Sequence, residues 1–215
     1  MTLSCYPTPG MGANTYLLEQ EGVCLIVDPG DANSPALARA KEIGNVAWIL
    51  LTHGHFDHIL GAAAFRRETG APLVIHALDA PMLTDPVRSL HAWMGEGLGA
   101  QEPVEADRLV GDGAEIPFGD TVIRVLHTPG HSPGSVCYAV GDLLLSGDTL
   151  FCGSMGRVDF PGGDAGQMTE SLRRLAALEG ERTVLPGHGE ATTLSRERAE
   201  NPYVKRACYG TLCDR

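Results

Sequence analysis

The stretch Thr52-His53-Gly54-His55-Phe56-Asp57-His58 says more about this chain than any other segment. It places three histidines and one aspartate within six positions, directly after the apolar run 46–51. Imidazole and carboxylate groups are the side chains that hold borderline divalent metals. His53 and His55 are two positions apart, so in extended backbone they project to the same side. We therefore expect this one loop to supply ligands for two metal ions.

Apolar runs and turn residues predict strands and helices in both halves of the chain. Strands are expected at 14–19, 23–27, 46–51 and 73–75, and again at 121–126, 135–140, 143–145 and 183–185. Helices are expected from Ser34 to Gly44, over 59–69, through Met168 and Leu172, and after a cap at Ser195. This pattern predicts an α/β sandwich of two sheets covered by helices.

Length and composition limit the class of protein. The 215 residues show no linker or repeat, so we expect a single domain over 1–215, with an irregular, lid-like insert at 77–105. A net charge of -11 argues against a nucleic-acid partner. We expect no signal peptide, no membrane-spanning segment and a cytoplasmic location. The six cysteines are expected to be free thiols, although Cys208 and Cys213 could instead pair or bind metal.

Ligand-type residues follow several of the predicted strands. Each of the five stands just after an apolar run, in a turn that contains glycine or proline: Asp28, His53, His131, Asp148 and His188. Loops on a rigid scaffold are where catalytic groups usually sit, so these residues converge if their strand ends share one edge. Taken singly, Asp28 and His188 could be ordinary turn residues. His76, His91 and His127 have no ligand-like neighbours and are interpreted as structural or surface residues.

Along the chain, His53-x-His55-x-Asp57-His58 is followed by His131, Asp148 and His188, an order that resembles the metallo-β-lactamase-fold hydrolases. The resemblance implies an αββα sandwich, with two mixed sheets flanked by helices and the site at one edge. It implies one ion held by His53, His55 and His131, and a second held by Asp57, His58 and His188. It also implies that Asp148 bridges both ions and that Asp28 orients a ligand.

Three segments narrow the resemblance. Thr128-Pro129-Gly130-His131-Ser132-Pro133-Gly134-Ser135 looks like the motif of glyoxalase II, the hydroxyacylglutathione hydrolase, and segments 151–164 and 200–203 are similar to the short, single-domain glyoxalase II-like proteins. Asp148 stands where the commonest zinc β-lactamases carry a cysteine, and His55 stands where flavodiiron proteins carry a glutamate. Full-length glyoxalase II adds a C-terminal helical domain with glutathione-binding residues, and this sequence shows none. The resemblance therefore predicts the fold and leaves the substrate open.

The implied reaction is hydrolysis of a small-molecule thioester, of the S-2-hydroxyacylglutathione type, by a hydroxide that bridges two metal ions. Asp57 and Asp148 would ligate the metals and orient that hydroxide. Zinc is the expected metal, with iron or manganese as alternatives, because histidine and aspartate accept all three. Arg157 is a candidate for the substrate carboxylate, unless it pairs with Asp159 or Asp164 to fix its loop. A monomer or a homodimer is expected.

The sequence also leaves other functions open. Persulfide dioxygenases share the fold and a segment like 156–160, and they use one iron on two histidines and one carboxylate. The segments 133–135 and 160–163 favour the hydrolase. Lactones and other esters are further possible substrates. A non-catalytic metal-binding or scaffold protein is disfavoured by the complete ligand set.

Overall fold

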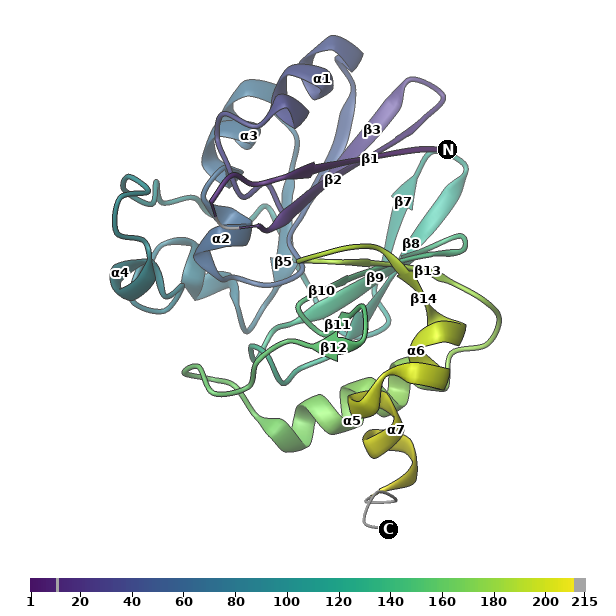
Figure 1. The fold of residues 1–215 in the computed structure, drawn as a ribbon. Helices are drawn as coiled ribbons and strands as arrows, with labels where there is room; N and C mark the ends of the chain where they lie inside the picture. The colour runs from purple at the N-terminus through teal and green to yellow at the C-terminus, as the bar shows by residue number, and fades with distance from the viewer. Residues whose placement is uncertain (11, 211–215) are drawn as a thin grey trace.

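Two six-stranded sheets pack face to face in the computed structural model, which describes residues 1–10 and 12–210, and helices cover both outer faces (Figure 1). The first sheet has the order β1 (Thr2–Pro7), β2 (Asn14–Gln20), β3 (Val23–Val27), β4 (Val46–Leu50), β5 (Leu73–His76) and β6 (Arg108–Val110). Its first three strands are antiparallel, and β4, β5 and β6 add in parallel.

The second sheet has the order β14 (Thr192–Thr193), β13 (Thr183–Pro186), β10 (Leu143–Gly147), β9 (Val136–Val140), β8 (Thr121–His127) and β7 (Glu115–Phe118). Only β10 and β13 are paired in parallel among these strands. A separate hairpin of β11 (Leu150–Phe151) and β12 (Ser154–Met155) follows β10. Both sheets are therefore mixed, and the predicted αββα sandwich is confirmed.

Helices cover the outer face of each sheet. The first sheet is covered by α1 (Pro35–Ile43) and α3 (Ala62–Thr69), and the second by α5 (Ala165–Ala176), α6 (Leu194–Glu200) and α7 (Pro202–Tyr209). Three shorter helical segments lie near one end of the sheets: α2 (Phe56–Ile59), the 3-10 turn η1 (Ala80–Leu83) and α4 (His91–Met94). No helix among the described residues is long and apolar enough to cross a membrane.

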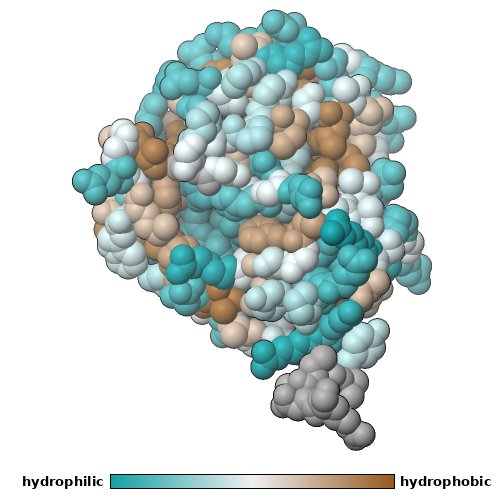
Figure 2. Space-filling view, in the orientation of Figure 1, coloured by the Kyte–Doolittle hydropathy of each residue, from teal (hydrophilic) through white to brown (hydrophobic). Residues whose placement is uncertain are grey.

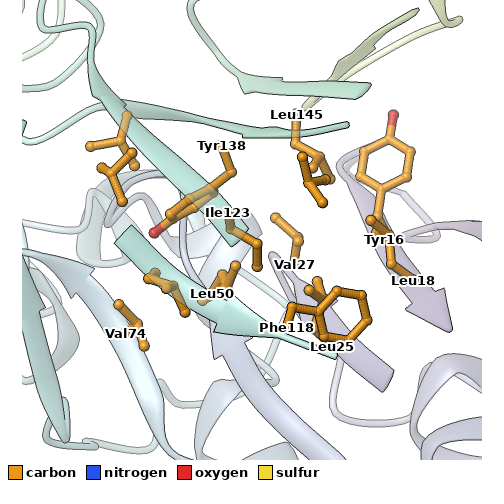
Figure 3. Packing of buried hydrophobic residues seen from close by; sticks show 14 of the residues in the cluster. Tyr16, Leu18, Leu25, Val27, Leu50, Val74, Phe118, Ile123, Tyr138 and Leu145 are labelled. Atoms are coloured by element: carbon orange, nitrogen blue, oxygen red, sulfur yellow. The ribbon is translucent and has the colours of Figure 1, made fainter. Parts of the chain in front are cut away.

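The main core lies between the two sheets. Because successive side chains of a strand point to opposite faces, one strand contributes to this core and also packs against the helices on the outer face. Leu25 and Val27 of β3 face the second sheet, whereas Cys24 and Ile26 pack against the helical side. Leu50 and Tyr138 meet in the central layer (Figure 3). The Tyr138 hydroxyl also donates to the Leu51 carbonyl at 2.8 Å, which ties the second sheet to the strand that leads into the histidine loop.

The structure corrects three details of the sequence analysis. The helix predicted over 59–69 is two helices, because the Gly61 N–H donates to the Pro29 carbonyl at 2.8 Å and a Cβ at 61 would lie 2.6 Å from that oxygen. Thr193, not Ser195, caps the following helix, since its side chain accepts from the Arg196 N–H. The 77–105 insert contains η1 and α4 and is otherwise irregular.

Candidate metal centre

The predicted ligand residues come together where the ends of β3, β4, β8, β10 and β13 meet. The histidine loop joins β4 to α2, and the other residues follow their own strands as expected. The described residues form three groups whose ligand atoms lie within 4.8 Å of one another: His53, His55 and His131; Asp57, His58 and His188; and Asp28, His53 and His58. Most of these side chains are buried, with His188 the most open.

In the first group, neighbouring hydrogen-bond partners determine which ring nitrogen of His131 and of His53 faces the other ligands. The His131 Nδ1–H donates to the Arg157 carbonyl at 2.8 Å, so a neutral His131 carries its lone pair on Nε2. That Nε2 lies 2.8 Å from Nδ1 of His55. Nδ1 of His53 lies 3.1 Å from the Thr52 hydroxyl, which directs Nε2 of His53 into the cluster. Three nitrogens therefore point to one small volume.

The second group is joined to the first by Asp148. In the second group, Nε2 of His188 lies 3.2 Å from Oδ2 of Asp57 and 3.3 Å from Nε2 of His58. Asp148 lies 3.4 Å from Nε2 of His58, 3.4 Å from Nε2 of His131 and 3.5 Å from Nε2 of His188. Its carboxylate thus reaches both groups, which is the placement that a bridging ligand requires.

Asp28 belongs to the support of the cluster, although it is close enough to be counted with the ligands. Its carboxylate accepts from the Thr52 N–H at 2.7 Å and from the Thr52 hydroxyl at 2.6 Å. It also lies 2.9 Å from Nδ1 of His58, and a proton on that nitrogen leaves Nε2 free to face Asp57 and Asp148. These contacts hold Thr52 and His58 in place, and a role of Asp28 in orienting a metal ligand stays a prediction.

Two buried polar atoms that face the other ligands have no hydrogen-bond partner among the residues that the structure describes: Nε2 of His53 and Oδ1 of Asp148. Buried polar groups without partners are costly, so such atoms indicate a missing ion or molecule. Imidazole nitrogens with carboxylate oxygens are the donor set of zinc, iron and manganese. The residues present therefore fit two divalent ions.

Electrostatics inside the cluster separate the histidines into two kinds. Burial and the neighbouring imidazoles lower the pKa of His53 well below its ordinary value, and burial lowers that of His55 to about 3. Burial also opposes charge on His58, but Asp57, Asp148 and Asp28 raise its pKa well above the ordinary value. The carboxyl pKa values of Asp57 and Asp148 are lowered against burial by His58, so both are ionised at neutral pH.

Comparison with known proteins agrees with this geometry. The family model described as the metallo-beta-lactamase superfamily matches residues 8–188. The chain belongs to the metallo-β-lactamase superfamily. A probable metallo-hydrolase of Bacillus subtilis is 37% identical, with 92% of this chain and 95% of that protein covered. A hydroxyacylglutathione hydrolase of Anaeromyxobacter dehalogenans is 40% identical over 82% of this chain, but only 61% of that protein is covered.

Two solved structures of the superfamily match nearly the whole chain. The BLEG-1 B3 metallo-beta-lactamase has a TM-score of 0.86 at 32% identity, with 94% of this chain and 99% of that chain covered. TTHA1623, solved in a di-iron-bound form, has a TM-score of 0.82 at 37% identity and covers 93% of this chain and 99% of its own.

The sequence left undecided whether Arg157 binds a substrate carboxylate or pairs with an aspartate of its own loop. Its guanidinium makes two hydrogen bonds of 2.7 Å to the Asp159 carboxylate and lies 3.8 Å from the centre of the Phe160 ring. The alternative of an ion pair within the loop is therefore the one seen, and Asp164 instead caps α5. A substrate carboxylate would have to use the remaining Nη1 edge or displace Asp159. Contact with substrate stays a prediction.

Among the other histidines, His76 and His127 stack with ring centres 4.2 Å apart, across the two sheets, and neither belongs to the three ligand groups. His91 packs edge-on against Phe56, with ring centres 5.9 Å apart. Five of the cysteines are free thiols, and Cys213 lies outside the described residues. The sequence did not reveal the supporting roles of Thr52 and Asp79, the buried residues that hold the ligand loops. Thr52 is not a ligand-type residue, and Asp79 lies outside the clustered motif.

Gly156→Ala is expected to destabilise the protein and loosen the cluster. A Cβ at 156 would lie 1.8 Å from the Asp148 carbonyl oxygen and 3.2 Å from Nδ1 of His131, so the backbone must move. Overpacking of this kind costs about 1–3 kcal/mol. In a domain of this size that lowers the unfolding temperature by roughly 2–10 °C. Gly111→Ala, where no described atom lies within 4 Å of the new Cβ, is the control for thermal unfolding and metal content. If the Gly156→Ala and Gly111→Ala variants unfold at the same temperature, the predicted clash at residue 156 is wrong.

Proposed function

We propose that this metal-dependent hydrolase cleaves a thioester of the S-2-hydroxyacylglutathione type. The observation that carries the proposal is the complete His and Asp cluster at the floor of an open cavity, in a chain 40% identical to a hydroxyacylglutathione hydrolase over most of its length. The superfamily supports a metal-dependent hydrolase. The proposal that its substrate is a thioester requires a test.

The cavity is lined by residues of the cluster and by a mixed set of apolar and charged side chains. Its volume is about 690 Å³, and Figure 2 shows a hydrophilic hollow on this face with hydrophobic surface beside it. The charged Glu96 and Arg157 line it, together with these apolar residues: Phe56, Leu90, Met94, Phe151, Met155 and Phe160. This lining suits a substrate with a polar carbonyl at the cluster and an apolar acyl or thiol portion beside the apolar residues.

The roles of the residues follow from their positions. His53, His55 and His131 would hold one ion, Asp57, His58 and His188 the second, and Asp148 both. When bound, the two ions supply a hydroxide nucleophile near neutral pH and polarise the substrate carbonyl. Asp57 and Asp148, ionised and facing the cavity, would orient the attacking water through hydrogen bonds. A thiolate leaves readily, so the protein needs no strong general acid at the leaving sulfur.

β-Lactam hydrolysis is a second candidate because the BLEG-1 B3 metallo-beta-lactamase is so similar in fold and length. Asp148 stands where the commonest zinc β-lactamases carry cysteine, but that comparison does not address a B3 enzyme. Persulfide oxidation on a single iron is the other alternative. The two hydrolyses differ in the substrate that they cleave, and persulfide oxidation differs from both because it uses a single iron and consumes oxygen.

One set of assays on a single preparation separates these functions. The purified protein is analysed for zinc, iron and manganese, then assayed with S-lactoylglutathione, a chromogenic cephalosporin and glutathione persulfide under oxygen monitoring. We expect two metals per chain, thioester hydrolysis and no oxygen uptake. Cephalosporin turnover that exceeds thioester turnover would replace the proposal with the second candidate. One iron per chain with oxygen uptake and no hydrolysis would refute it.

A further inference from the structure

Asp79 joins the two loops that carry the first ligand group, although it lies outside both motifs. It precedes η1 at the start of the 77–105 insert and is fully buried, with an exposed fraction of 0%. Its Oδ2 accepts from the Gly54 N–H at 3.0 Å and from the Ser132 hydroxyl at 2.6 Å. Its Oδ1 accepts from the Gly134 N–H at 2.7 Å. One carboxylate thus ties the residue between His53 and His55 to both sides of the turn after His131.

The segment Ser132-Pro133-Gly134-Ser135 is built around this carboxylate. The Ser132 hydroxyl, which donates to Asp79, also lies 2.7 Å from the Ser135 hydroxyl, and the Ser132 N–H donates to that same Ser135 oxygen. A Cβ at 134 would lie 2.6 Å from Oδ1 of Asp79, so a larger residue would expel the carboxylate. A Cβ at 54 would lie 2.7 Å from the Met82 side chain and 3.0 Å from the Asp79 carbonyl oxygen. Asp79 therefore requires glycine at 134, whereas Met82 and Asp79 together require it at 54.

We propose that Asp79 is a positioning residue that sets the distance between His55 and His131, and so the metal affinity of the first group. It touches none of the ligand side chains and acts through the backbone of the two loops. The inference rests on the metal-binding role of His53, His55 and His131 and does not depend on the substrate. Among the described residues, Asp79 makes no hydrogen bond to His188 or its loop after β13, and Asp57 and His58 lie on α2, beyond the Gly54 N–H that donates to Asp79.

Only a carboxylate serves all three donors at this position. An asparagine has one acceptor oxygen and one NH₂ group, and the two backbone N–H groups contact different oxygens of Asp79. In either amide orientation, one backbone N–H faces the NH₂ group. Asp79→Asn should therefore displace one ligand loop relative to the other while it keeps the volume of the side chain.

The test measures zinc affinity by calorimetry on metal-stripped protein, in two backgrounds that each keep one group. His188→Ala leaves the first group complete, and His131→Ala leaves the second. Asp79→Asn should weaken zinc binding about 10–100-fold in the His188→Ala background, as loss of a supporting hydrogen bond does elsewhere. It should change the affinity less than about twofold in the His131→Ala background.

Glu197→Gln is the matched control for general destabilisation. Glu197 is equally buried and also accepts three hydrogen bonds, from Thr192, Gly153 and Asn201, away from both ligand loops. It should lower the unfolding temperature and leave zinc affinity unchanged in both backgrounds. If Asp79→Asn does not fold, Ser132→Ala removes one of the three donors and should weaken the first group in the same direction.

The outcomes are distinct. Equal weakening in both backgrounds, or none in either, would overturn the positioning role. A wild-type protein that binds no zinc would overturn the metal assignment and this inference with it. Absence of thioester hydrolysis in a protein that binds two metals would refute the proposed function and leave the role of Asp79 intact.

Discussion

Replacing Asp148 by alanine is expected to abolish the binding of both metals and nearly all hydrolytic activity. Among the described residues, Asp148 is the one carboxylate within 3.5 Å of nitrogens from both ligand groups, namely His131 in the first and His58 and His188 in the second. It is 8% exposed, so water cannot replace it at low cost. We expect kcat/KM to fall at least about 10³-fold, which is ~4 kcal/mol of barrier.

Metal analysis of the purified variant, beside the rate of thioester hydrolysis, checks this expectation. Asp142→Ala removes an exposed carboxylate in the turn between β9 and β10 and should keep two metals and full activity. Asp148→Asn keeps the shape but not the charge, so it should resemble alanine in metal content. A variant of Asp148 that still binds two metals would refute the bridging role. A variant that loses one metal alone would assign Asp148 to a single ion.

Local pattern was sufficient to predict the layers of the fold and the membership of the cluster. The runs around Val27, Leu50 and Leu145 are short, apolar and followed by turn residues, so each strand and the residue after it could be identified. The shared edge of the sheets then brought Asp28, His53, Asp148 and His188 together. The strands at the two edges of the first sheet were harder to predict, because β1 is largely exposed and β6 is only three residues long.

The parts that could not be predicted depend on contacts distant in sequence. Nothing near Gly61 predicts a helix break there, because the group that excludes a side chain is the Pro29 carbonyl. Asp79 looks like an ordinary turn residue until residues 54 and 134 surround its carboxylate. Arg157 had two possible partners in sequence, and only the folded loop shows that Asp159 pairs with it. Periodicity carries no information about such contacts.

Removing the metals is expected to lower stability strongly. A ligand present at 1,000 times its Kd stabilises a protein by about 4 kcal/mol, so two sites that are each filled at that excess contribute roughly 8 kcal/mol. For a domain of this length, that corresponds to an unfolding temperature lower by ~15–30 °C after chelation. Differential scanning calorimetry before and after treatment with a chelator, and again after zinc is restored, measures the difference.

The metal-free protein should also show a stability maximum near pH 6.5, the ordinary pKa of histidine. His53 and His55 have lowered pKa values in the folded chain, so below pH 6.5 the unfolded state binds more protons and stability falls as the pH falls. His58 and His188 have raised pKa values, so their stabilising protons are lost as the pH rises above 6.5. Bound metal replaces those protons, and the loaded protein should lose no stability above pH 6.5. Identical profiles with and without metal, between pH 6 and 9, would contradict an ion held by His58 and His188.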